Sequence, residues 1–177
     1  MMMYSISLYM CSARDHESEE AMTHLQIMLW LCVAAYGAHV LEEFVFDWRT
    51  WSQQVLHLPT RWEDFYLTNC LVIVVGIVAV EIAPEYPAVA LGFPGLMLIN
   101  ATFMHVFPFL RTKGRFSPGL ITGVLFFWPL GVYTMLAADL SARVFAIAFA
   151  VGAALLAMPI GFILLKRNRY FDQTRPY

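Results

Sequence analysis

A histidine and two adjacent glutamates interrupt an apolar stretch of the chain, in the run His39-Val40-Leu41-Glu42-Glu43. A histidine beside carboxylates can move protons as a general acid or base, or it can hold a divalent cation. A charged side chain near the centre of a bilayer costs about 2.5–3.5 kcal/mol, even on lenient insertion scales. If this stretch crosses a membrane, its two glutamates therefore need partners.

A second apolar stretch carries Asn100 and His105. Combining the two stretches gives the metal-ligand set His39, Glu43 and His105, and two histidines with one carboxylate suit a single zinc, iron or manganese ion. A di-iron centre would need about four carboxylates. A centre that works by acid–base chemistry instead would use His39, Glu42, Glu43 and His105, with Asn100 as an orienting neighbour.

A helical wheel places the first three polar residues on one face. At about 100° per residue, Glu42 lies about 60° to one side of His39 and Glu43 about 40° to the other. We expect this face to point into a helix bundle. The opposite arc is apolar and should face lipid; it includes Trp30, Leu41 and Val45.

The positions of Asn100 and His105 agree less well with a regular helix. They are five residues apart and so lie about 140° apart around it. Both can flank one site only if the site faces the arc between them, or if Pro94 or Pro108 distorts the winding.

The composition identifies the setting of these residues as a membrane. Of the 177 residues, 60% are hydrophobic and only 14% are charged, against roughly 25% charged in a soluble domain. The mean hydropathy is +0.63. A net charge of −2 provides no basic face, so nucleic acid is not an expected partner. The three cysteines form no CxxC pair and are predicted to be free thiols.

Five apolar runs are long enough to cross a hydrocarbon core of about 30 Å, which needs about 20 helical residues. The sequence thus predicts an all-α protein, a bundle of five transmembrane helices. A short interfacial helix is expected around 49–58, ended by Pro59. Residues 1–22 are predicted to be a polar tail, with Met22 as an alternative start; 23–166 form the membrane domain and 167–177 a basic tail. The spans are expected at about 25–46, 66–83, 88–109, 118–137 and 142–165.

The basic residues predict the orientation. Arg14 and Arg143 lie on one side of the five spans, and the other nine lysines and arginines lie on the opposite side, which includes the C-terminus. The positive-inside rule therefore predicts a protein of the cytoplasmic (inner) membrane with a cytoplasmic C-terminus. Counted from that side, the His/Glu/Asn cluster falls in the cytoplasmic half of the bundle.

The run His39-Val40-Leu41-Glu42-Glu43 resembles the motif that names the HXXEE family of small bacterial integral membrane proteins. Two other segments are similar to what such chains carry, 100–105 and the run 115–120 with Ser117-Pro118-Gly119. The resemblance extends over about 25–165. It implies a helical membrane protein whose motif residues matter, and it implies no particular reaction.

The polar cluster permits three readings of function. In the first, the protein is a membrane-embedded enzyme of acid–base isomerase or cyclase type, or a metal-dependent hydrolase, acting on a lipid-like or apolar substrate. In the second, the carboxylates are proton or cation sites of a transporter, for which five unequal spans show none of the usual inverted repeats, although a homodimer could form a pathway. In the third, the polar groups join helices in a structural or partner subunit without chemistry of its own. The enzyme is the favoured reading, and the choice stays open.

The loop between the third and fourth spans could add a substrate-headgroup site formed by Arg111, Arg115 and Ser117. Its basic residues also serve as topology signals and as contacts to anionic lipid headgroups. Ser117 and Pro118 together are typical of a helix start, with Ser117 as the N-cap.

Overall fold

A computed structural model describes residues 2–138 and 141–166 of the chain, with side chains from His24 onward, apart from 163, 164 and 166. The described elements are all helical, which confirms the predicted class. They are α1 (Met2–Val45), α2 (Trp48–Val55), α3 (Trp62–Ile82), α4 (Pro87–Ala90), α5 (Gly92–Asn100), η1 (Ala101–Val106), α6 (Phe107–Arg111), α7 (Leu120–Thr122), η2 (Gly123–Phe127), α8 (Trp128–Ala137) and α9 (Ala142–Lys166).

Five helical runs among the described residues are long and apolar enough to span a membrane, as the sequence predicts. The expected polar tail at 1–22 continues α1 as a helix back to Met2, and the expected basic tail at 167–177 lies outside the described residues. The third span combines α4, α5, η1 and α6, and the fourth combines α7, η2 and α8. The five spans are His24–Val45, Trp62–Ile82, Pro87–Arg111, Leu120–Ala137 and Ala142–Phe162.

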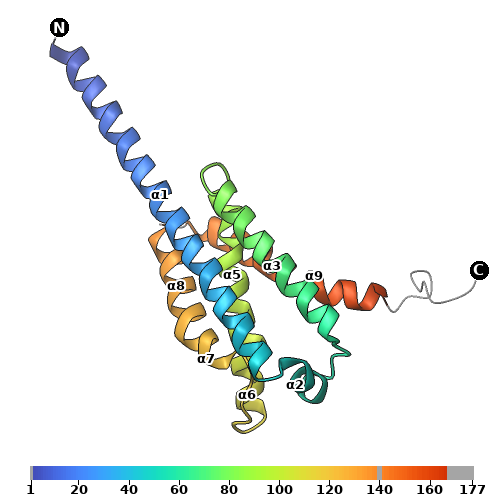
Figure 1. Ribbon diagram of the computed structural model, residues 1–177. Coiled ribbons are helices and arrows are strands. Elements are labelled where there is room, and N and C mark those ends of the chain that lie inside the picture. The colour runs from blue at the N-terminus through green and yellow to red at the C-terminus, as the bar shows by residue number, and fades with distance from the viewer. Residues whose placement is uncertain (1, 139–140, 167–177) are drawn as a thin grey trace, which may run out of the picture.

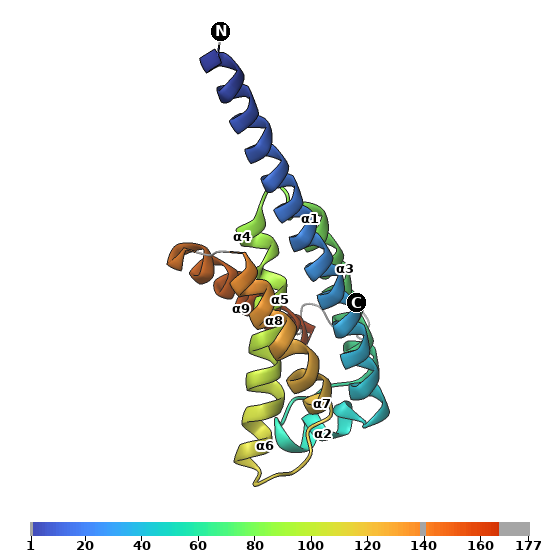
Figure 2. The same cartoon turned by 90° about the vertical axis from the view of Figure 1, so that its left-hand side faces the viewer.

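The helix α5 lies at the centre of the bundle, with α1, α3, α8 and α9 around it (Figures 1 and 2). All side chains from Leu91 to Met97 are buried. The helix α9 crosses α5 at a steep angle, and small residues let the two backbones touch: a Cβ on Gly152 would lie 2.5 Å from the backbone nitrogen of Leu96. This close crossing fixes the third span, which carries Asn100 and His105, in the core.

The short helix α2 forms where the sequence predicts an interfacial helix. Asp47 precedes it in a left-handed conformation (φ 52°), and its side chain accepts a hydrogen bond from the Thr50 backbone. Hydrogen bonding to Thr50 holds the pKa of Asp47 below its usual value. The helix turns Trp51 inward, where the side chain is 5% exposed. α2 thus covers one end of the bundle (Figure 1).

Two spans change their winding just before a proline. The segment η1 is a π-helix that ends two residues before Pro108, and η2 is a π-helix that ends two residues before Pro129. Proline lacks the N–H that would continue the α-helical ladder, and its ring crowds the preceding turn. The widened π turn brings residues that are five apart closer to one face. Asn100 and His105 are accordingly both buried.

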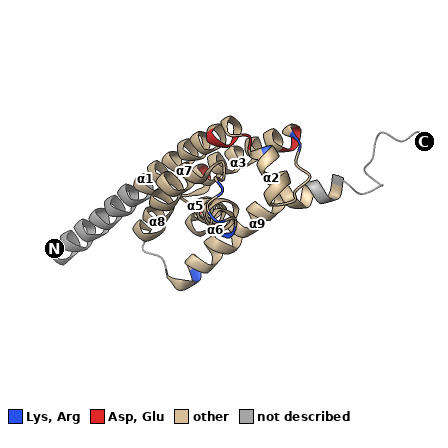
Figure 3. Ribbon diagram, turned by 90° about the horizontal axis from the view of Figure 1, so that it is seen from below, with Lys and Arg blue, Asp and Glu red and all other residues tan. Residues whose placement is uncertain are grey.

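Charged side chains are sparse and gather at the ends of the bundle. Figure 3 looks at the end where α2 and α6 lie, and lysines and arginines mark the loops there. Arg143 begins α9 at the other end, after α8. The C-terminal part of α1, with the His/Glu motif, lies toward the end that carries α2 and α6 (Figure 1).

Candidate metal centre

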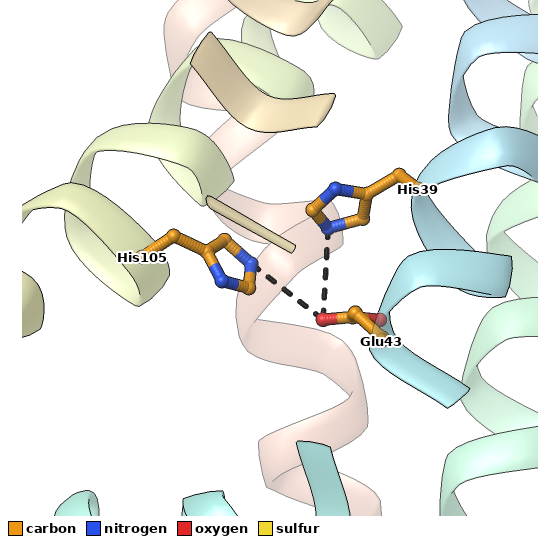
Figure 4. Close-up of side chains that lie close together, drawn as sticks. All are labelled: His39, Glu43 and His105. Carbon is orange, nitrogen blue, oxygen red and sulfur yellow. Dashed lines mark ion pairs between the residues drawn. The ribbon is translucent and has the colours of Figure 1, made fainter. Parts of the chain in front are cut away.

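His39, Glu43 and His105 meet inside the bundle, at the interface of α1 and η1 (Figure 4). One carboxylate oxygen, Glu43 Oε1, lies 3.6 Å from His39 Nε2 and 3.5 Å from His105 Nε2. The two imidazole rings are nearly perpendicular, with centroids 4.8 Å apart. Both histidines are fully buried and Glu43 is 5% exposed. The wheel on α1 is confirmed, because the lipid-side residues Trp30, Leu41 and Val45 are exposed.

The other nitrogen of the His39 ring is fixed by a hydroxyl from the fourth span. His39 Nδ1 lies 2.8 Å from Thr122 Oγ1, and this hydroxyl lies 2.6 Å from Glu42 Oε2. An ionised Glu42 only accepts, so the single hydroxyl proton of Thr122 goes to the carboxylate. The Nδ1 of His39 must then be the donor to Thr122. In the neutral ring, Nε2 is left with a bare lone pair that points at Glu43.

The His105 ring is held in the same way. Its Nδ1 lies 3.1 Å from the Ser117 hydroxyl. With the proton on Nδ1, the ring donates to Ser117 and Nε2 turns a lone pair towards Glu43; when the Ser117 hydroxyl donates to Nδ1, Nε2 carries the proton instead. Ser117 is completely buried. The Nε2 atoms of both histidines therefore face the same carboxylate oxygen.

The three facing atoms, Nε2 of each histidine and Oε1 of Glu43, are not joined by hydrogen bonds. Neither Nε2 has a hydrogen-bond partner among the described residues, although both are buried. The separations of 3.5 and 3.6 Å exceed the 2.7–3.2 Å of an N–H···O hydrogen bond. Two ligand atoms at about 2.1 Å from a tetrahedral ion lie about 3.4 Å apart. The two nitrogen–oxygen separations thus suit a shared cation better than a direct hydrogen bond. The three ligand atoms together lie within 4.8 Å, so an ion bound by all three would draw them closer.

Glu42 has a different role from its neighbour in the sequence. Its carboxylate accepts four hydrogen bonds, from the backbone nitrogens of Gly119, Ile121 and Thr122 and from the Thr122 hydroxyl. It thereby caps the start of the fourth span from α1, and this accounts for one of the two buried glutamates without any ligand. The helix begins at Leu120 with Gly119 as its N-cap, so the expectation that Ser117 is the N-cap was wrong.

Gly119 is the tightest point of the centre. Its φ of +94° suits glycine, and an added Cβ would lie 2.6 Å from Cε1 of both His39 and His105. The backbone of residue 119 therefore packs directly against the two rings. Sequence reasoning missed Thr122 and read Gly119 only as part of the Ser-Pro-Gly run.

Aromatic rings enclose the centre. The Phe127 ring packs against His39 at 4.3 Å between centroids, and Tyr36 stacks on Phe127. On the other side, Trp51 of α2 stacks on His105 at 6.5 Å. These apolar walls shield the histidines and Glu43 from bulk water, which strengthens electrostatic interactions there.

The remaining predicted residues lie around the centre rather than in it. Asn100 and Glu43 line a common cavity, and Asn100 Oδ1 has no partner among the described residues. Arg111 lines a second, outer cavity. Arg115 donates to Gln54 of α2 on the surface. Of the three expected headgroup residues, Ser117 thus faces His105, while the two arginines lie apart from the centre.

These features define a class of protein: a polytopic helical membrane protein with a buried His/Glu cluster between its first, third and fourth spans. Residues 30–134 match the family described as protein of unknown function with HXXEE motif. This match covers more than half of the chain, which therefore belongs to the HXXEE family. No curated protein and no solved structure matches the chain. The residues that give the motif its name are His39, Glu42 and Glu43. His39 and Glu43 are candidate ligands of the centre, and Glu42 binds the start of the fourth span beside it.

Proposed function

We propose that this protein is a membrane-embedded enzyme that uses one divalent metal ion, held by His39, Glu43 and His105, for hydrolytic chemistry on a lipid-like substrate. One observation carries the proposal. Two buried histidine nitrogens, each with its opposite ring nitrogen fixed by a hydroxyl, point at one oxygen of a buried carboxylate. The three ligand atoms lie within 4.8 Å of one another.

The surroundings of the ligands support a metal rather than a purely structural ion pair. Metal-binding histidines usually donate their second ring N–H to an oxygen, which fixes the ring and its tautomer. Thr122 is the oxygen that does this for His39, and the Ser117 hydroxyl lies in the corresponding position beside His105. A structural role without an ion would leave the buried lone pair of His39 Nε2 facing a carboxylate, which is unfavourable.

The number of ligands favours catalysis over a structural site. Structural zinc sites usually have four protein ligands, whereas catalytic sites have three. In a three-ligand site a divalent ion keeps a position for water and acidifies it, or polarises a substrate carbonyl. The protein itself orients the ligands through Thr122 and Ser117. It keeps the site apolar through Phe127 and Trp51.

The location of the centre favours a lipid-like substrate. His39, Glu43 and His105 lie within spans, and a substrate must reach them from the membrane or its interface. The nine-to-two distribution of basic residues further supports a cytoplasmic C-terminus and a centre nearer the inner leaflet. Under the same proposal, the protein resides in the inner membrane.

Metal analysis of the full-length protein, purified in detergent, tests the proposal. We expect about one zinc, iron or manganese ion per chain, lost in His39→Ala and in Glu43→Gln. Glu81→Gln is the matched control, because Glu81 is an exposed glutamate of α3. His24→Ala is the corresponding histidine control, since His24 is exposed near the start of the first span.

Two outcomes would contradict the proposal. Metal that persists in both His39→Ala and Glu43→Gln would place the binding site elsewhere. Absence of bound metal after reconstitution with each of the three ions would support acid–base chemistry by the same residues, without a metal. In that case proton flux in liposomes separates an acid–base enzyme from a transporter.

A further inference from the structure

A cavity of about 90 Å³ reaches Glu43 from the side of α3 and α9. Its walls are largely apolar, with Leu96 of α5 and Leu155 and Leu156 of α9 among them. A single water needs roughly 10–15 Å³ of such space. The cavity therefore has room for a polar group and a few carbons beside the metal ligands, but not for a whole lipid.

The polar part of this wall offers hydrogen-bond acceptors and one donor without a partner among the described residues, the indole N–H of Trp48. Glu43 contributes its carboxylate. The Tyr36 hydroxyl donates its proton to Asn69 Oδ1 at 2.8 Å, so towards the cavity it can only accept. No lysine or arginine is among the described side chains that line the cavity. A carboxylate or phosphate would therefore meet the carboxylates of Glu43 and Asp64 without a cationic side chain, whereas an O–H group would find acceptors and could itself accept from the Trp48 indole.

Asn100 carries the acceptor in this wall that has no hydrogen-bond partner among the described residues. Its side chain lines the cavity and is 9% exposed, and its Oδ1 has no partner among the described residues. An unsatisfied buried carbonyl oxygen costs about 1–3 kcal/mol. The terminal torsion of asparagine is broad, so a small rotation presents this oxygen to a group inside the cavity.

A second cavity of about 560 Å³ continues the first one outward. The two share three lining residues, Leu58, Met104 and Ile160. Phe103 and Phe107 add apolar surface to the outer cavity, and Arg111 lies at its edge. The two cavities are therefore adjacent and define a largely apolar path that leads towards Glu43.

We infer that this path binds a long-chain, uncharged molecule that carries an O–H or N–H donor, with the donor held by Asn100 Oδ1 and the chain lying in the outer cavity. Asn100 is then the residue that determines specificity for this donor. The inference rests on the proposed function only in treating this molecule as the substrate of the metal centre. Binding itself requires only the cavity and Asn100.

Photolabelling of the purified protein in lipid nanodiscs tests the inference. Three diazirine probes of equal chain length are compared: a long-chain primary alcohol, the matching primary amide, and the methyl ether of the alcohol, which has no donor. Labelled peptides are identified by mass spectrometry. We expect the alcohol, the amide or both to label segment 155–160 about three- to tenfold more than the ether, which is the effect of one hydrogen bond.

Substitution of Asn100 provides the decisive comparison. Asn100→Leu keeps the approximate size of the side chain and removes the acceptor, so we expect it to abolish the preference for donor-bearing probes. Thr134→Val is the control, because Thr134 is buried and bonds to the Leu130 carbonyl of its own helix. Thermal unfolding of each variant checks that it is folded. If the leucine variant unfolds, Asn100→Ala, which also removes the acceptor, takes its place with the same expected result.

The result separates this inference from the proposed function, since metal content is measured on the same samples. Equal labelling by alcohol, amide and ether, or an unchanged preference in Asn100→Leu, overturns the inference even if the wild-type protein holds one metal ion. A donor preference that depends on Asn100 in a protein without bound metal upholds the inference and leaves the metal proposal as the one that fails.

Discussion

His39 and Glu42, one turn apart on α1, are linked through a single hydroxyl on another span. Thr122 Oγ1 lies 2.8 Å from the His39 ring nitrogen and 2.6 Å from the Glu42 carboxylate. The direction of these two hydrogen bonds determines which nitrogen of His39 is bare. Glu42 thus sets the tautomer of His39 through Thr122. As a consequence, the lone pair of His39 Nε2 faces Glu43.

Replacing Thr122 by valine should weaken metal binding without removing a ligand. Valine has a similar shape but lacks the hydroxyl, so His39 Nδ1 loses its acceptor and Glu42 loses one donor. Loss of such an outer partner typically costs 10–100-fold in metal affinity, which competition with a chromogenic chelator measures. Thr122→Ser should retain most of the affinity. Equal affinity in the valine variant would show that the hydroxyl does not orient the ring.

Replacing Gly119 by alanine should displace both histidines. The new methyl group would lie 2.6 Å from each ring, and the residue would keep a φ near +94°. We expect loss of metal and a destabilisation greater than about 1 kcal/mol, seen as a lower unfolding temperature in detergent. Gly37→Ala is the control, since a Cβ there meets nothing within 4 Å. A Gly119→Ala protein with full metal content would contradict this description of the centre.

The two neighbouring glutamates should respond differently to the same substitution. Glu42→Gln places an amide donor among four hydrogen-bond donors, and the mismatch should cost about 1–3 kcal/mol of stability. Glu43→Gln should abolish metal binding but leave the metal-free protein as stable as the wild type or more so, because the amide can donate to a bare histidine nitrogen. Unfolding curves with and without a chelator distinguish the two; the reverse pattern would exchange the roles assigned here.

The orientation of the chain can be tested with C-terminal fusions. With the C-terminus in the cytoplasm, a fused green fluorescent protein should be fluorescent and a fused alkaline phosphatase inactive. The physical reason is the excess of basic residues in the loops on that side, such as Arg111, Lys113 and Arg115. An active phosphatase would place the centre in the outer half of the membrane.

Much of this architecture could be predicted from the sequence. Apolar runs of about 20 residues predicted all five spans, and the helical wheel predicted that His39, Glu42 and Glu43 face the interior. Burial and the cost of charge in lipid explain why such patterns are reliable. The contact of His105 with the α1 cluster was expected from residue type and depth, although a regular helix would place His105 about 140° around the axis from Asn100.

Other features could not be predicted because they depend on geometry between distant segments. The π turn of η1 follows from how the helix accommodates Pro108. The sequence shows the proline, but it does not show that the helix responds by widening into a π turn. The distinct roles of Glu42 and Glu43 depend on which span meets each face of α1. Thr122 is an ordinary helix residue by sequence, and only its contact with His39 and Glu42 identifies it.

The cap that Glu42 places on the fourth span also has a consequence for biosynthesis. The first span enters the membrane long before residues 119–122 are made, and until then two carboxylates and a histidine on α1 lack their partners. The first helix is therefore less stable in the bilayer until the fourth span is inserted and its backbone N–H groups bind Glu42. Chains truncated before residue 118 should accordingly be poorly retained in the membrane and rapidly degraded, whereas chains truncated after residue 138 should already have a pinned first helix.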